Sequence, residues 1–281
     1  MSVDPEIEAK CKEISTNYSA CDVSDALLKL KIPQAGFLPD ILPINHNNPS
    51  PKPLVAPLST VLFVPKSPAS SSSSTTPAAT GGETAPTLIQ QESNIPQTKH
   101  WTDLPTPGTI ALLQQPRGQI CAVCGDILAT RLKVRGVRGI VADGRVRDIV
   151  SLSELCQAPS TASTSSSDGR RGEGFTVWSR GTSTVGTGLA AQAWCVDVPL
   201  SVPNKPPITS FSSSENPSPS LQVNPGDIIV CDEGERGSVV IPLSKLDEVL
   251  SLLPSLKEAD EKCIADVEAG VDVREAFRRH R

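Results

Sequence analysis

Residues 125–148 read GDILATRLKVRGVRGIVADGRVRD and combine one predicted helix with one predicted strand. The first part predicts a helix of about ten residues that Gly136 closes, because glycine readily adopts the left-handed conformation at a helix end. The second part, GIVADG at 139–144, predicts a short buried strand that ends at its Asp-Gly pair. A short apolar run at 119–124 precedes the helix. This alternation of strands and helices predicts a mixed α/β fold.

Four residues form the predicted start of the helix: Gly125, Asp126, Ile127 and Leu128. Glycine allows the backbone to approach a ligand closely, and the first turn of a helix leaves N–H groups that favour an anion. A small carboxylate fits such a place. An ordinary strand-to-helix turn, with Asp126 as a helix cap, fits the same residues, and both interpretations stay open at this point.

Arg147 and Asp148 directly follow the predicted strand. Ligand sites of α/β sheets lie at strand ends and in the loops that follow them. The planar guanidinium of Arg suits a carboxylate or an oxyanion, and Asp is a hard oxygen ligand for Mg²⁺ or Mn²⁺. The pair therefore predicts a site for a metal and the substrate oxygens bound to it. The alternative is an exposed ion pair on a loop.

The same stretch contains further basic residues: Arg131, Lys133, Arg135, Arg138 and Arg145. A basic run of this kind suggests a nucleic-acid patch. No aromatic residue lies between its members, and the formal net charge of the chain is -5, which opposes a general nucleic-acid binder. We therefore expect a solvated helix face and no nucleic-acid partner.

Three Ser- and Pro-rich segments interrupt the 281-residue chain, at 66–99, 157–174 and 203–220. They contain too little apolar surface to order themselves, so we predict disordered insertions. The remainder is about 210 residues, a normal size for one domain. We therefore predict a single domain over residues 1–281 with these insertions inside it.

The N-terminus, MSVDPEIEAKCKEI, lacks the apolar core of a signal peptide, and no apolar stretch reaches the roughly 18 residues of a membrane span. We expect a cytoplasmic protein with no membrane partner.

In the reducing cytoplasm the eight cysteines are expected to be mostly buried thiols. Cys121 and Cys124 form one C-x-x-C pair, which without a second pair or a nearby His is a weak sign of zinc. The three histidines are not spaced as metal ligands: His46, His100 and His280.

Helices are expected to bracket a middle part that is dominated by strands. Asp22 is expected to cap the second helix, and Asp272 with Glu275 to form a capping box for the last one. The expected helices cover 5–14, a segment that starts near 21, 243–253, 255–270 and 272–280, and the expected strands cover 54–64, 108–115, 196–202 and a pair joined by a tight turn within 225–242.

The stretch 125–148 closely resembles the family that contains 4-hydroxy-4-methyl-2-oxoglutarate aldolases, oxaloacetate decarboxylases and the regulators of ribonuclease E activity. The catalytic branch of that family carries an Asp, twenty residues and then Arg-Asp, and here Asp126, residues 127–146 and Arg147-Asp148 repeat this spacing. Other blocks match in order: VSDALLKL (23–30), APLSTV (56–61), PTPGTIALL (105–113), VWSRGTST (177–184) and VNPGDIIVCDEGERGSVVIP (223–242). The turn at 232–237 is longer than the usual Asp-x-x-Gly of the family.

The resemblance implies a compact β/β/α swivelling domain of the ribonuclease E activity regulator-like type, assembled as a homotrimer or a hexamer with sites between subunits. It implies that Asp148 is the side-chain ligand of a divalent metal, Mg²⁺ or Mn²⁺, and that Arg147 contacts a 2-oxo acid and stabilises its negative charge. The backbone from Gly125 to Leu128, Ile127 included, would bind the pyruvyl carboxylate, and Asp126 would orient a water or the substrate for proton transfer.

The expected function is therefore a metal-dependent lyase that cleaves a carbon–carbon bond in a small 2-oxo acid and yields pyruvate. Such cleavage generates a pyruvate enolate, and a Lewis-acid metal together with an Arg stabilises the charge on the oxo oxygen without a Schiff-base lysine. The same enolate forms in aldol cleavage and in decarboxylation of oxaloacetate. Two alternatives stay open: a regulatory member that binds a protein partner, and an enzyme of the same fold with another substrate.

Overall fold

A computed structural model of the chain describes residues 3–44, 50–66, 92–157, 174–203 and 220–281. Most of the three predicted insertions lies outside these ranges, and so does His46. Within the described part, no helix is long and apolar enough to cross a membrane.

One long strand, β2 (Leu54–Pro65), organises the main sheet because it pairs with three other strands. It is parallel to β3 (Ile110–Gln114), and antiparallel to β9 (Ile228–Asp232) along its first half and to β6 (Ala191–Val196) along its second half. Its sequence, LVAPLSTVLFVP, is apolar almost throughout, as expected for a strand that is covered on both faces.

The parallel part of the sheet continues from β3 to β4 (Gly139–Val146) and β5 (Thr176–Thr182). The short strand β1 (Leu42–Pro43) pairs with β5 at one end, and β10 (Gly237–Ile241) forms a hairpin with β9 at the other. The described strands of this eight-stranded sheet therefore follow the order β1-β5-β4-β3-β2-β9-β10, with β6 beside β2.

The segment before β1 brings the two ends of the sheet together. Phe37 forms a bridge with Val239 of β10, and the N–H of Leu38 donates to the carbonyl of Ser238 at 3.0 Å. A few residues later the chain enters β1 and pairs with β5. The sheet is therefore nearly closed, like a barrel. A small separate sheet is formed by β7 (Leu200–Val202) and β8 (Leu221–Val223).

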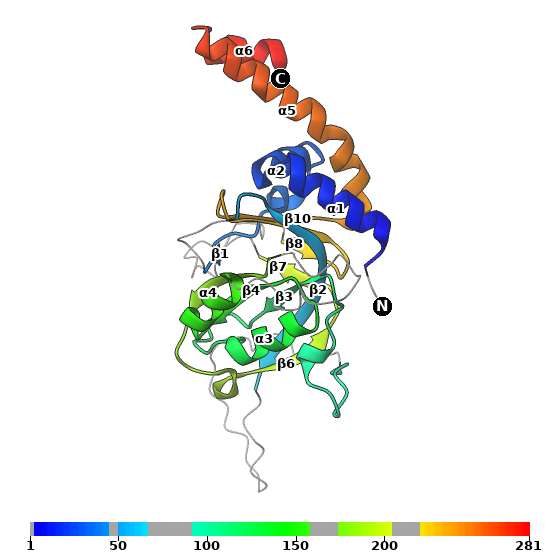
Figure 1. The fold of residues 1–281 in the computed structure, drawn as a ribbon, viewed down its shortest axis with the longest axis vertical. Helices are drawn as coiled ribbons and strands as arrows, with labels where there is room; N and C mark the ends of the chain where they lie inside the picture. The colour runs from blue at the N-terminus through cyan, green and yellow to red at the C-terminus, as the bar shows by residue number, and fades with distance from the viewer. Residues whose placement is uncertain (1–2, 45–49, 67–91, 158–173, 204–219) are drawn as a thin grey trace, which may run out of the picture.

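Two helices connect the parallel strands and cover one face of the sheet (Figure 1). The helix α3 (Asp126–Val134) lies between β3 and β4, and α4 (Ile149–Gln157) lies between β4 and β5. Their buried residues, Ala129, Leu132 and Leu152, belong to the same core cluster as the apolar side chains of β3 and β4. Burial of this face fixes both helices against the strands.

The terminal helices pack against the other end of the sheet. The helices α1 (Pro5–Asn17) and α2 (Ala20–Lys29) share a core cluster with β9, β10 and the first part of α5 (Leu246–Glu268). Beyond that point α5 leaves the body, and α6 (Val273–His280) folds back against its outer end (Figure 1). The described 3₁₀ helices are short and lie at Pro33–Gly36, Trp101–Asp103, Thr187–Leu189 and Leu243–Lys245.

Most of the elements expected from the sequence are present. The strand expected at 196–202 is instead the end of β6 at Val196 and the separate strand β7 from Leu200. Asp272 is the N-cap of α6 and accepts from the N–H of Arg274, but Glu275 pairs with Arg278 and Arg279, so the expected capping box was wrong.

Four further expectations were wrong in detail. Ser19, not Asp22, is the N-cap of α2, and Asp22 is the third residue of a reciprocal capping box. The predicted helices at 243–253 and 255–270 are one helix that runs through Pro254. Residues 119–124 form no strand, although Cys124 makes an isolated bridge to Val146.

The fourth error concerns the Asp-Gly pair at 143–144, which lies inside β4 and does not end it. Gly144 leaves room for the side chain of Gln115, because a Cβ at this position would lie 2.6 Å from the Gln115 Cβ. The Gln115 amide donates to the carbonyl of Cys121 at 2.6 Å and accepts from the N–H of Arg145 at 2.9 Å. The glycine therefore serves close packing, and the strand reaches Val146.

Candidate active site

The start of α3 lies beside the end of β4. The N–H of Val123 donates to the carbonyl of Arg145 at 2.8 Å, and the N–H of Arg147 donates to the carbonyl of Cys124 at 3.0 Å. These bonds hold the segment before α3 alongside the last residues of the strand. The structure thus brings together the two parts of the predicted site, which the intervening helix and strand separate in sequence.

Gly125 is required by the close approach of the Arg-Asp pair. Its φ of -134° and ψ of -170° describe extended backbone that any residue adopts. A Cβ on this residue, however, would overlap Oδ2 of Asp148 and would lie 3.2 Å from Cγ and Nε of Arg147. Any side chain here would displace the pair, so the glycine sets the distance between helix and strand end.

Asp148 occupies the junction between β4 and α4. Its φ of 60° lies in the left-handed region, which is uncommon for a residue other than glycine. Its carbonyl accepts from the N–H of Leu152 at 2.9 Å in the first turn of α4. Its Oδ2 lies 3.3 Å from Nε of Arg147 and 3.4 Å from the N–H nitrogen of Asp126. The junction therefore aims the carboxylate at the start of α3.

The Arg147–Asp148 pair is half-exposed, with 41% of the Arg side chain and 36% of the Asp side chain accessible to solvent. An ion pair at this exposure contributes at most about 1 kcal/mol to stability, since water and salt screen it. Stability therefore gives little reason for this arrangement. Its position at the end of a parallel strand is that of a ligand site.

Two of the N–H groups at the start of α3 already have carboxylate acceptors from the chain. The N–H of Ile127 donates to Oδ1 of Asp126 at 2.7 Å, and the N–H of Asp126 points at Oδ2 of Asp148. The interpretation of Asp126 as the helix cap was wrong, because Gly125 is the N-cap of α3, it has no side chain to cap the helix, and Asp126 is the first helical residue. The helix start is nevertheless a place where carboxylates bind.

The two carboxylates fit a divalent cation of the Mg²⁺ type, which usually takes one or two protein carboxylates and fills its shell with water. Both contacts of Asp148 are long, at 3.3 and 3.4 Å, so a cation competes with weak partners. The described residues contain no group of three or more His, Cys, Asp and Glu side chains that could hold a metal. Within one chain, Asp148 is therefore the side-chain ligand candidate, and Asp126 is the other carboxylate at the site.

Cys124 lies directly behind the site and is buried. Burial, with a smaller contribution from the charges of Asp126 and Asp148, raises the pKa of its thiol to about 12. The thiol is therefore protonated at neutral pH and packs as a small apolar group. Cys121 is buried as well, and none of the eight cysteines, all of which are described, forms a disulfide, as expected for structural thiols.

A loop that the sequence analysis did not include forms another wall of the site. Residues 183–189 follow β5, and the N–H of Ser183 donates to the carbonyl of Val146 at 2.9 Å. Gly186 lies so close to Arg147 that a Cβ on it would be 2.9 Å from Nη1. The two closely spaced glycines after a strand, Gly186 and Gly188, were the available sequence signal.

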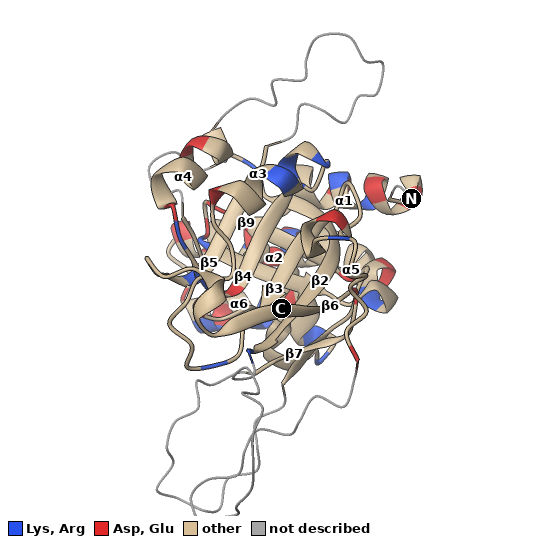
Figure 2. Cartoon of the chain, turned by 90° about the horizontal axis from the view of Figure 1, so that it is seen from below, with Lys and Arg blue, Asp and Glu red and all other residues tan. Residues whose placement is uncertain are grey.

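The basic run was expected to form a solvated helix face, and this holds only in part: Arg131 and Arg145 are exposed, whereas the other three are partly buried. Each of its residues donates to a neighbouring segment within the fold. Arg131 pairs with Asp103 at 2.7 Å, and the other four reach main-chain carbonyls: Lys133 that of Leu155, Arg135 those of Thr102 and Pro105, Arg138 that of Val55, and Arg145 that of Thr182. Basic and acidic residues are interspersed over the fold (Figure 2).

A buried charge cluster, also absent from the sequence-based set, lies within β4 and its neighbours. The Asp143 side chain is fully buried and accepts from Nε of Arg180 at 2.7 Å and from Nη2 of Arg117 at 3.2 Å. Burial lowers the pKa of Arg117. The cluster ties the strand that carries Arg147 and Asp148 to β5 and to the loop after β3.

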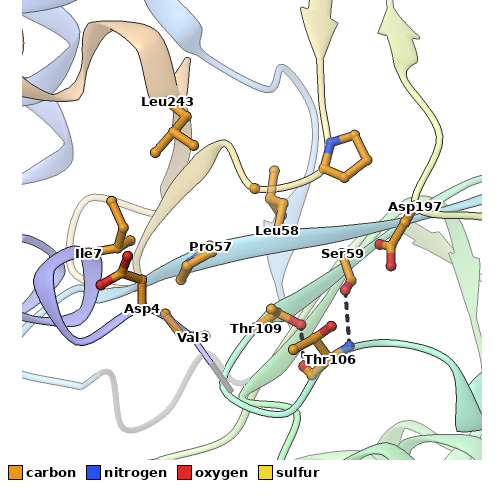
Figure 3. Close-up of a pocket in the computed structure, with 12 residues that line it drawn as sticks. Val3, Asp4, Ile7, Pro57, Leu58, Ser59, Thr106, Thr109, Asp197 and Leu243 are labelled. Atoms are coloured by element: carbon orange, nitrogen blue, oxygen red, sulfur yellow. Dashed lines mark hydrogen bonds between the residues drawn. The ribbon is translucent and has the colours of Figure 1, made fainter. Parts of the chain in front are cut away.

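A separate cavity of about 310 Å³ lies toward the opposite end of the parallel strands (Figure 3). It is lined by Ile7 of α1, Leu58 of β2, Thr109 before β3, and Asp197, among others. Burial raises the pKa of Asp197. None of the predicted site residues lines this cavity, so its volume says nothing about the Arg-Asp site.

The family of the chain follows from its sequence. Residues 20–240 match the model of the family described as RraA-like, Aldolase/RraA. This range covers more than half of the chain and contains the whole candidate site. The chain belongs to the Aldolase/RraA family. The resemblance seen in the sequence and the α/β fold class are thereby confirmed.

Solved structures share the fold. An uncharacterised protein from Pseudomonas syringae pv. tomato str. DC3000 superposes with a TM-score of 0.63 at 19% identity, covering 99% of this chain and 96% of that chain. Streptomyces coelicolor RraAS2, described as an unusual member of the RNase ES inhibitor RraA protein family, gives 0.60 at 21% identity and covers 92% and 96%. A protein described among novel cellulases from gut-associated microbes gives 0.61 at 14% and covers 93% and 89%. At these identities the likeness concerns the fold.

Proposed function

We propose that the protein is a divalent-metal-dependent lyase that cleaves a carbon–carbon bond in small 2-oxo acids and releases pyruvate. Its activity would be that of a 4-hydroxy-4-methyl-2-oxoglutarate aldolase, an oxaloacetate decarboxylase, or both. The observation that carries this proposal is the 3.4 Å approach of the Asp148 carboxylate to the start of α3, with Arg147 beside it. One small site thereby offers a cation ligand, a guanidinium and a helix N-terminus.

The roles of the residues follow from their chemistry. The substrate carboxylate binds the first N–H groups of α3 and replaces the Asp126 carboxylate at Ile127, which leaves Asp126 available to orient a proton. The Arg147 guanidinium faces the 2-oxo oxygen and stabilises the negative charge that grows there as the bond breaks. A divalent cation bound by Asp148 and water would add Lewis-acid polarisation of the same oxygen.

Apolar side chains around the site support an assembly of several copies. Four of them are exposed by more than half: Ile120 at 61%, Ile127 at 76%, Val150 at 75% and Leu189 at 59%. They belong to the loop before α3, the starts of α3 and α4, and the loop after β5, which are the segments that build the site. We propose that a second copy covers them in a homotrimer or hexamer with the site between subunits.

The test is pyruvate release from oxaloacetate and from 4-hydroxy-4-methyl-2-oxoglutarate, coupled to lactate dehydrogenase. It is run with Mg²⁺ or Mn²⁺ and again with excess chelator. We expect release that the chelator abolishes and that returned metal restores. Release that is indifferent to chelator would contradict the metal dependence, and absence of release with both compounds would contradict the substrate assignment.

A regulatory member of the family that binds a protein partner is the second candidate. The observation that favours it is that the family description covers RraA as well as aldolase, and that Streptomyces coelicolor RraAS2, described as a member of the RNase ES inhibitor RraA protein family, shares the fold. Binding of Mn²⁺, measured by calorimetry, separates the two. A folded oligomer that neither binds Mn²⁺ nor releases pyruvate supports the regulatory function, whereas metal binding without release supports a same-fold enzyme with another substrate.

A further inference from the structure

We propose that Gly186 is a positioning residue that sets the place of the Arg147 guanidinium in the candidate site. The geometric part of this inference stands on contacts within the chain. Its catalytic consequence rests on the proposed function. Gly186 lies in the loop 183–189 after β5, which contains none of the residues predicted for the site.

The loop is tied to both segments that carry the site. The N–H of Ser183 donates to the carbonyl of Val146 at 2.9 Å, at the end of β4. The N–H of Ala122 donates to the carbonyl of Val185 at 2.8 Å, and Oγ1 of Thr187 donates to the carbonyl of Ala122 at 2.6 Å. The backbone around Gly186 is therefore held in place relative to Arg147.

The glycine at 186 is explained by contact and not by backbone conformation. Its φ of -74° and ψ of 161° are accessible to every residue. A Cβ at this position, however, would lie 2.9 Å from Nη1 and 3.5 Å from Cζ of Arg147. The guanidinium thus rests against the bare backbone of the loop, and any side chain would push it away.

The remaining contacts of Arg147 make the position of its guanidinium depend on this loop. Nε faces Asp148 at 3.3 Å, which is a long contact, and the side chain is 41% exposed. Near Cγ and Nε it passes close to Gly125. The side chain therefore lies against two glycines, one on each of two anchored segments. Asp148 and Gly125 meet it at Nε, so Gly186 governs the outer end.

A methyl group at 186 moves the outer end of a flexible side chain and no backbone, so the fold tolerates it. The donors of Arg147 are displaced, however, and a misplacement of about 1 Å of a catalytic group costs on the order of a hundredfold in rate. We expect Gly186→Ala to lower kcat by about tenfold to a hundredfold with an unchanged melting temperature. Because the lost contact is one made with developing charge, kcat falls and KM changes little.

The matched control is Gly188→Ala in the same loop. A Cβ at 188 would meet no atom within 4 Å, and this glycine is not among those with positive φ. This variant is expected to keep the wild-type kcat. Equal losses in both variants, or no loss in Gly186→Ala, would overturn the proposal.

A double-mutant cycle tests whether Gly186 acts through Arg147. In an Arg147→Ala background the methyl group at 186 has nothing to displace, so Gly186→Ala is expected to change the residual rate by no more than about twofold. A loss as large as in the wild-type background would show that Gly186 acts by another route.

A turnover-independent measurement separates this inference from the proposed function. Phenylglyoxal modifies accessible guanidinium groups, and peptide mass spectrometry follows Arg147 alone. We expect Arg147 to be modified faster in Gly186→Ala than in the wild type or Gly188→Ala, because it is pushed from the loop toward solvent. An unchanged rate overturns the positioning role. If the wild type releases no pyruvate while the modification rate still rises, the lyase proposal fails and the positioning role stands.

Discussion

Asp148 combines a left-handed backbone with a half-exposed carboxylate, and the two properties are separable by mutation. The left-handed conformation costs a non-glycine residue about 1 kcal/mol. Asp148, whose carboxylate approaches the start of α3, adopts this conformation. Asn tolerates the same conformation as Asp. A change from carboxylate to amide at this position therefore alters the chemistry and spares the backbone.

We predict that Asp148→Asn abolishes chelator-sensitive pyruvate release and weakens Mn²⁺ binding, with a melting temperature close to that of the wild type. Calorimetry with Mn²⁺ and the coupled assay are the measurements. Asp40→Asn is the control, because Asp40 also has a positive φ, 62°, and an exposed side chain, but lies outside the site. Unchanged metal affinity in Asp148→Asn would argue against its role as a ligand.

Two cysteines differ in access and should differ in reactivity. Cys21 is exposed as a residue. Partial burial of its thiol, and then the nearby charge of Glu235, raise the pKa of the thiol to about 11. Its thiolate therefore forms only as the pH rises toward that value. We predict that iodoacetamide labels Cys21 faster with each step in pH from 8 to about 11. The variant Glu235→Gln is expected to be labelled faster than the wild type at pH 8. Buried Cys124 is expected to stay unlabelled. Peptide mass spectrometry checks this, and labelling of Cys124 alongside Cys21 would contradict its burial.

The strand β4 leads into the candidate site and is held in place by buried charges. Its Asp143 side chain has no accessible surface and faces two guanidiniums, Arg180 at 2.6 Å and Arg117 at 3.2 Å. A buried carboxylate of this kind compensates charges that would otherwise be unpaired away from water. The strand end that presents Arg147 and Asp148 depends on this compensation.

We predict that Asp143→Ala lowers the free energy of unfolding by about 3–5 kcal/mol, because it leaves two guanidiniums partly buried without their shared partner. Urea denaturation measures this change. Glu258→Ala is the control, since Glu258 forms an exposed pair with Lys262 on α5, and its loss is expected to matter much less. A loss for Asp143→Ala no larger than that of the control would show that the cluster does not support the strand.

The candidate site and the C-terminal helices lie at different ends of the molecule (Figure 1). The family match ends at residue 240, before α5 and α6 begin. Figure 1 shows these helices extending away from the part of the fold that contains α3 and α4. Assembly through the apolar side chains around the site therefore does not require the outer part of α5.

We predict that Val150→Asp separates the assembly into single chains near 29.6 kDa, because it places a charge in a contact that must exclude water. Light scattering after size exclusion measures the mass. Ile264→Asp on α5, which is 59% exposed, is the control and is expected to leave the assembly intact. A wild-type mass for Val150→Asp would contradict an interface around the site.

Most of the local elements, and the membership of the Arg-Asp set, could be predicted from short stretches of sequence. The apolar run of β2, the helix that Gly136 closes and the spacing from Asp126 to Arg147 and Asp148 are encoded within short windows, where periodicity, capping and turn chemistry act. The same residues carried the resemblance to the family that the match over 20–240 shows. No contact between distant segments was needed for these conclusions.

Contacts between segments that are distant in sequence could not be predicted in this way, because they depend on packing. The Asp-Gly pair stays inside β4 because Gln115 fills the space above Gly144. The residues of the basic run donate hydrogen bonds to carbonyls, and in one case to a carboxylate, that are distant in sequence. Gly186 reaches Arg147 only because three hydrogen bonds fold its loop onto the site. Periodicity and spacing describe neighbours along the chain, whereas these contacts are set by packing across it.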